Sequence, residues 1–197
     1  MRSRVGVVLL SGLLFVVAAC SSDPKPAPPA PSPSASASAS AQVPALHLPT
    51  VAQGAPCPMT GERAVKSSIA YDDGQKVLGR GPVAPIAYYF DGAGATLTLT
   101  PEDKNPDGTY SKKVRWLGVG YTGPLLVRAA RIDGAGTAFA KLFDMAEHVA
   151  GGYRFVLTEK DNDFPATTMV SGPGCYAYQV DGTNFSDVIV FQAALAK

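Results

Sequence analysis

The sequence is poor in the residues on which enzyme catalysis usually depends. Its 197 residues include only two histidines, His47 and His148, and three cysteines. His47 lies near the end of a Pro-rich stretch, and His148 follows Glu147 in a segment expected to face solvent. The GxSxG and HExxH strings of serine hydrolases and metalloproteases do not occur. Because catalysis needs several such groups to converge, the sequence argues against an enzyme.

An excess of charge of one sign is also absent. The chain has 17 basic and 16 acidic residues, a formal net charge of +1, and charged residues make up 17% of the total. Such a balance gives no excess of positive charge to attract nucleic acid, so we expect no nucleic-acid partner. Few charges combined with 20 glycines and 17 prolines are typical of a β-rich domain with many turns rather than a helical bundle.

Long hydrophobic runs are limited to residues 5–19, which follow Arg2 and Arg4 and are too few to span a bilayer. This pattern predicts a secretory signal peptide over residues 1–19, and its removal would change the formal charge to −1. The run ends in Val17-Ala18-Ala19-Cys20, which resembles the signals of bacterial lipoproteins. The alternative is an ordinary signal peptide followed by an incidental cysteine.

The lipoprotein resemblance implies that Cys20 carries a diacylglycerol and becomes the first residue of the mature chain. Each buried acyl methylene contributes about 0.8 kcal/mol, so two long chains hold a protein stably on a membrane. We therefore expect a lipid-anchored, palmitate-type lipoprotein on the extracytoplasmic face of the cell membrane.

Residues 20–45 form the next segment, which is almost entirely Pro, Ala and Ser up to about Gln42. This composition cannot bury enough apolar surface to fold, and it predicts a disordered linker that acts as a spacer. Linkers of this kind are glycosylated in some bacteria, but no acceptor residue can be singled out. The folded domain is expected over residues 46–197.

Two cysteines, Cys57 and Cys175, lie in this domain. In an oxidising compartment such a pair usually forms a disulfide, and we expect one here; the alternative is two separate buried thiols. Closing a loop of more than a hundred residues would stabilise the fold by roughly 4 to 5 kcal/mol through the entropy of the unfolded chain.

Short runs of β-branched and aromatic residues, separated by Gly, Asp and Asn clusters, recur through the domain at the spacing of a β-sandwich. Alternation places Tyr176, Tyr178 and Val180 on one face of a strand, and Ile189 and Phe191, with Phe185, on one face of its neighbour. We therefore expect an all-β antiparallel sandwich. The expected strands are 64–71, 83–90, 95–100, 112–117, 125–132, 153–158, 167–171, 175–181 and 185–192.

Residues 138–150 fit two structures. An apolar stripe at helical spacing, with Thr137 as a possible cap and Gly151 as a stop, predicts a short helix. Residues 137–143 fit a strand equally well, and both alternatives stay open at this point. The stripe consists of Phe139, Leu142, Phe143, Ala146 and Val149.

Three blocks of the domain resemble an uncharacterised group of secreted or lipid-anchored actinobacterial proteins with immunoglobulin-like sandwich domains. The resemblance implies an immunoglobulin-like fold and an extracytoplasmic location, and it brings no assigned activity. The blocks are residues 79–85, the segments 113–116, 121–128 and 131–134, and residues 173–182 followed by Phe185 and Ile189.

Acidic residues offer two weak signals for a site. Asp161 and Asp163 could serve a carboxylate-based enzyme, although acids in a loop are usually solvated. Residues 103–108 match the DxDxDG opening of a calcium loop, with Ser111 at its ninth position. The twelfth position is Val114 instead of the required Glu, so a hairpin turn is the better interpretation and no metal ligand is assigned.

Aromatic residues offer a possible binding surface at Tyr88, Tyr89, Trp116 and Tyr121. Neighbouring residues of a strand point to opposite faces, so at most one of Tyr88 and Tyr89 would face outward. Trp116 is expected in the core.

These observations predict a non-catalytic binding or interaction module of the bacterial envelope, with no cofactor and an unknown binding site. Its expected partners are the membrane, through Cys20, and an envelope protein or wall polymer. The alternative is an extracellular hydrolase acting on a wall or envelope substrate.

Overall fold

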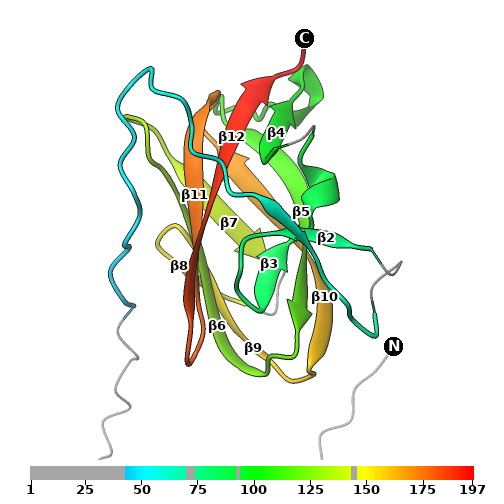
Figure 1. The fold of residues 1–197 in the computed structure, drawn as a ribbon. Helices are drawn as coiled ribbons and strands as arrows, with labels where there is room; N and C mark the ends of the chain where they lie inside the picture. The colour runs from blue at the N-terminus through cyan, green and yellow to red at the C-terminus, as the bar shows by residue number, and fades with distance from the viewer. Residues whose placement is uncertain (1–42, 70–73, 92–93, 143–145) are drawn as a thin grey trace, which may run out of the picture. The chain divides into compact units, whose positions relative to one another are not determined.

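The computed structural model describes residues 43–69, 74–91, 94–142 and 146–197. These residues form strands and two short 3-10 turns, and no α-helix occurs among them. The strands assemble into a four-stranded and a six-stranded sheet that pack face to face, with a small two-stranded sheet beside them (Figure 1). The predicted all-β sandwich is confirmed.

Neighbouring strands in these sheets are antiparallel, apart from the parallel β4–β12 pair. The four-stranded sheet has the order β3 (Val83–Pro85), β5 (Tyr110–Val119), β10 (Asp161–Val170) and β7 (Ala138–Leu142). The six-stranded sheet has the order β4 (Thr96–Leu99), β12 (Ser186–Leu195), β11 (Gly174–Asp181), β6 (Gly123–Arg131), β9 (Gly152–Leu157) and β8 (Glu147–Val149). The small sheet pairs β1 (Glu62–Ala64) with β2 (Lys76–Leu78), and the 3-10 turns are η1 (Ala87–Tyr89) and η2 (Pro101–Asp103).

Aromatic side chains from both sheets form the centre of the core. Trp116 of β5 meets Tyr178 of β11 edge to face, with ring centroids 5.1 Å apart, and Tyr178 stacks on Phe191 of β12 at 4.6 Å. All three side chains are fully buried, as predicted for Trp116 and for the shared faces of β11 and β12. The hydroxyls of Thr168 and Tyr178 are 2.6 Å apart, so a buried hydrogen bond also joins the two sheets.

Residues 43–60, called the strap below, run along the outer face of the six-stranded sheet (Figure 1). Leu48, Val51 and Cys57 of the strap pack on a small second cluster that includes Ile132 and Ala177. The predicted Cys57–Cys175 disulfide is present, with the two Cα atoms 5.5 Å apart. Unlike the bridge of antibody domains, it fixes the strap to one sheet and does not join the two sheets.

Of residues 138–150, the described ones form strands β7 and β8, so the predicted short helix is wrong. Ala140 and Leu142 are buried at a spacing of two, and β7 pairs with β10 from Ala138 to Leu142. Phe143 of the proposed stripe lies outside the described residues. Pairing with β10 uses the β7 backbone groups that a helix would bond internally, so the sheet contact overrides the helical spacing.

Several predicted strand boundaries are also wrong. Of the expected strand 64–71, Ala64 ends β1, residues 65–69 lie outside any strand, and residues 70 and 71 lie outside the described residues. The expected strand 83–90 ends at Pro85, and η1 follows because the chain turns there. Strand β10 begins at Asp161, six residues before the predicted start at Thr167, and β2 was not expected.

The hydrogen bond between Thr168 and Tyr178 provides a test of how the sheets are joined. We expect Thr168→Val to destabilise the fold by about 1 to 3 kcal/mol, because the Tyr178 hydroxyl stays buried without its partner. Adding Tyr178→Phe should restore part of this loss, because both polar groups are then removed. Urea unfolding of the single and double variants measures the effect. Strictly additive losses would contradict the expectation.

Candidate functional site

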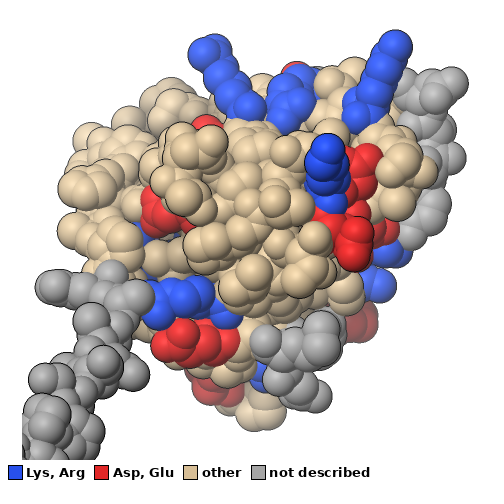
Figure 2. All heavy atoms as spheres, turned by 90° about the horizontal axis from the view of Figure 1, so that it is seen from below, with Lys and Arg blue, Asp and Glu red and all other residues tan. Residues whose placement is uncertain are grey.

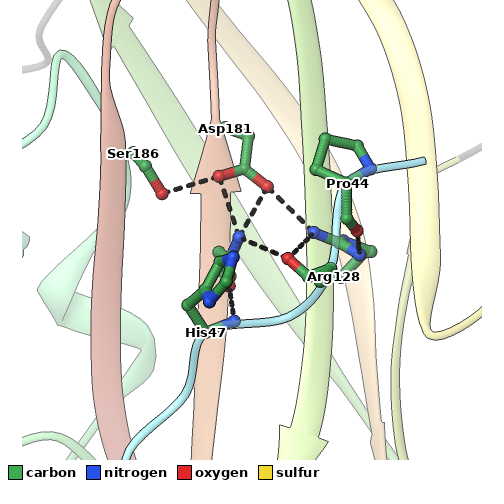
Figure 3. Close-up of polar contacts among 7 residues, drawn as sticks. Pro44, His47, Arg128, Asp181 and Ser186 are labelled. Atoms are coloured by element: carbon green, nitrogen blue, oxygen red, sulfur yellow. Dashed lines mark hydrogen bonds and ion pairs between the residues drawn. The ribbon is translucent and has the colours of Figure 1, made fainter. Parts of the chain in front are cut away.

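Three polar side chains form a cluster, called the clasp below, on the outer face of the six-stranded sheet. Arg128 of β6 pairs with Asp181 of β11 at 3.0 Å, and Gln179 donates to both oxygens of the same carboxylate at 2.9 Å. Ser186 of β12 donates to Asp181 at 2.6 Å. Figure 3 shows these groups converging on Asp181 from three neighbouring strands. The carboxylate is therefore held by several donors at once.

The clasp binds the main chain of the strap. Arg128 donates to the carbonyl oxygen of Pro44 at 2.5 Å and to that of Ala45 at 3.4 Å. Gln179 accepts a hydrogen bond from the His47 amide at 2.6 Å and donates to Ala45 O at 3.4 Å (Figure 3). Pro44 and Ala45, at the end of the predicted linker, thus contact the sheet through main-chain atoms.

Burial makes the clasp costly to disturb. Arg128 is 3% exposed, and its Nε has no hydrogen-bond partner among the described residues. Removing one member of a buried ion pair leaves the other charge without compensation in a poorly hydrated site. The clasp is therefore a structural device that fixes the strap to the sheet.

A groove of about 620 Å³ lies beside η1 and β2. Tyr88 borders it and is 86% exposed, while Ile86, Ala87 and Phe90 of its wall are buried. The Tyr88 ring meets Tyr89 edge to face, with centroids 5.6 Å apart and an interplanar angle of 88°. The prediction that at most one of the two tyrosines faces outward is confirmed, although they lie in a 3-10 turn and not in a strand.

The charged residues of the groove are balanced. Glu62 and Asp91 contribute two carboxylates, and Lys76 and Arg115 contribute two cations. Lys76 forms an ion pair with Glu62, and Arg115 forms one with Asp163, donating from Nε to Asp163 Oδ1 at 3.0 Å. Among the described lining residues, carboxylates and cations are thus equal in number, and both cations are paired with carboxylates.

The other aromatic candidates are structural. Trp116 is fully buried, and Tyr121 is 7% exposed. The Tyr121 hydroxyl donates to Pro124 O at 2.6 Å and accepts from the Thr183 amide at 3.0 Å, so it fixes two turns. Of the predicted aromatic surface, Tyr88 is strongly exposed, and the partly buried Tyr89 lines the same groove.

The two carboxylates considered for catalysis are engaged in local structure. Asp163 forms the ion pair with Arg115. Asp161 accepts hydrogen bonds from the Ser68 amide at 2.9 Å and from the Gly120 amide at 3.1 Å, as well as from both Ser67 and Ser68 hydroxyls. The hydrogen bonds from Ser68 and Gly120 lower the pKa of Asp161 to about 2. This carboxylate therefore joins two loops in its charged form.

The calcium-like string forms a turn, as expected. Asp103 accepts from the Thr100 amide and pairs with Lys112, whereas Asn105 donates to the Thr109 and Ser111 hydroxyls. Lys104 and Tyr110 pair across this turn. Within the described ranges, no group of three or more His, Cys, Asp or Glu side chains is arranged to hold a metal ion.

The remaining predicted residues fall in different places. Cys20 lies outside the described residues. His47 contacts the clasp through its main chain, and His148 is exposed and stacks on Phe139. Among the described residues, no helix is long and apolar enough to cross a membrane. Comparisons with protein-family models, curated proteins and solved structures found no match for this chain.

The sequence did not reveal the clasp as a site. Arg128 of β6 is 51 residues before Gln179 and 53 before Asp181, both of β11. Only the register between the two strands brings Arg128 opposite Gln179. One signal was present: Gln179 and Asp181 alternate with the buried Tyr178 and Val180, which places them together on the other face of β11.

The clasp predicts a large effect for Arg128→Met. We expect a loss of about 3 kcal/mol in unfolding free energy, because Asp181 stays on the sheet without its cation, and faster hydrogen exchange at the His47 amide. The control is Lys76→Met, which breaks an exposed pair with Glu62 and should cost less than about 1 kcal/mol. Equal losses in the two variants would refute the role of the clasp.

Asp161 predicts a pH-dependent difference in stability. Its folded-state pKa of about 2 lies below the ordinary value of about 3.9, so its stabilisation is complete above the ordinary pKa and is lost as the pH falls through 2. Asp161→Asn should lower the urea midpoint at neutral pH, and the difference from wild type should vanish near pH 2. Glu159→Gln, an exposed acid nearby, is the control and should show no such trend.

Proposed function

We propose that this chain is a lipid-anchored module of the bacterial envelope that acts by binding a partner and not by catalysis. The signal-like residues 1–19 and Cys20 support the anchor, and the resemblance to lipid-anchored sandwich proteins agrees with it. The Cys57–Cys175 disulfide fits an oxidising, extracytoplasmic compartment.

The observation that carries the proposal is the position of the strap relative to the groove. Arg128 lies on the outer face of the six-stranded sheet, since its neighbour Val127 belongs to the core. Arg115 lies on the outer face of the four-stranded sheet, since Val114 and Trp116 are buried. The two outer faces of a sandwich point in opposite directions. Pro44 and Ala45, which the clasp binds at the start of the strap, therefore lie on the opposite face of the sandwich from Arg115 of the groove.

Surface charge is compatible with binding an uncharged or mixed partner in the envelope. On the face shown in Figure 2, acidic and basic side chains lie next to one another around a largely uncharged centre. Binding on such a surface depends on specific contacts more than on long-range attraction, because opposite charges at short spacing cancel each other's field.

Replacement of Cys20 tests the anchor. In a bacterial host that processes lipoproteins, the wild-type chain should sediment with membranes and enter the detergent phase on phase separation, whereas Cys20→Ala should do neither. Mass spectrometry of the amino-terminal peptide should show a diacylglyceryl group on Cys20 in the wild type alone. Ser21→Ala is the control and should remain in membranes. Retention of Cys20→Ala in the membrane fraction would sink the proposal.

A further inference from the structure

We propose that the groove beside η1 binds a neutral oligosaccharide, with Tyr88 as the surface on which a sugar ring stacks. The inference rests on the proposed function only in that the module acts by binding. It is drawn from the exposure of Tyr88, the charge balance of the groove, and its size.

Tyr88 has the geometry of a stacking platform. Its ring is 86% exposed, and the edge-to-face contact with Tyr89 orients it at the border of the groove. The face of an aromatic ring carries partial negative charge, so it attracts the weakly positive C–H groups on the face of a sugar. Stacking of a sugar on this ring would remove exposed apolar surface from water, which is favourable.

The polar groups around Tyr88 suit hydroxyl groups. Each sugar hydroxyl is both a donor and an acceptor, and the groove provides carboxylate acceptors in Glu62 and Asp91 and cationic donors in Lys76 and Arg115. Because Lys76 is already paired with Glu62 and Arg115 with Asp163, an acidic ligand would gain little net Coulombic attraction. A neutral ligand that forms many hydrogen bonds gains most from this lining.

The shape of the groove favours a small ligand over a protein. Its volume of about 620 Å³ falls within the range of roughly 300 to 1,000 Å³ that is typical of small-molecule clefts. Protein interfaces depend on clustered aromatic and aliphatic anchors. Among the described residues that line the groove, Tyr88 is the only large apolar side chain that is strongly exposed, because Ile86 and Phe90 are 3% and 5% exposed.

The test uses the full mature protein, purified in a detergent that contains no sugar. Isothermal titration calorimetry measures binding of four neutral hexasaccharides, namely cellohexaose, mannohexaose, chitohexaose and arabinohexaose. We expect at least one to bind, about tenfold or more weakly to Tyr88→Ala than to wild type, a loss of about 1.4 kcal/mol or more. Tyr88→Phe should retain most of the affinity, because it keeps the ring.

Three controls separate the possible outcomes. Val156→Ala, an exposed apolar site on β9, should bind as wild type does, and urea unfolding should show that Tyr88→Ala is folded. Affinity should be nearly constant between low and high salt, since the ligand is uncharged.

The inference is overturned if none of the four sugars binds, if Tyr88→Ala binds equally well, or if only an acidic hexasaccharide such as hexagalacturonate binds. Fractionation of Cys20→Ala is independent of these measurements, so failure of the anchor and failure of sugar binding are distinguishable.

Discussion

Strand β11 is buried on both faces, and the organisation of the domain depends on this constraint. Its inner face carries Tyr176 and Tyr178 into the core between the sheets, and its outer face carries Cys175 and Gln179 under the strap. A strand that is covered on both sides cannot shift by one residue without exchanging its two sets of contacts. The register of β11 therefore fixes the core and the strap together.

The two faces are stabilised by different interactions. Inside, the aromatic rings bury a large apolar area, and burial raises the pKa of the Tyr178 hydroxyl, which stays neutral and bonded to Thr168. Outside, the small apolar cluster is supplemented by a disulfide and a buried ion pair. Since the strap presents mostly exposed side chains, covalent and polar contacts replace the apolar packing that it lacks.

Local alternation allowed much of this sheet to be predicted. The core-facing sides of β11 and β12 were predicted from the alternation of apolar residues on either side of a short turn. The disulfide was predicted from the number of cysteines and the expected compartment. The first half of β10 was missed because its acids and Pro165 resemble a loop. Pro165 is tolerated on its β5 side because its partner there, Arg115, directs its carbonyl away from β10 to the amide of Ile86. No hydrogen bond from Pro165 to β5 is therefore required. The clasp and the groove join distant segments, which no local pattern can specify.

The order of the contacts along the strap, with hydrogen bonds at its start and the disulfide near its end, has a mechanical consequence. Tension applied from the amino-terminal side first meets the hydrogen bonds of Pro44, Ala45 and His47, which can break and re-form singly. At Cys57 the load is divided between the backbone and the covalent bridge to β11, a strand in the interior of the six-stranded sheet. The first part of the strap can thus detach and lengthen under load, while part of the force enters the sandwich through an interior strand rather than an edge strand.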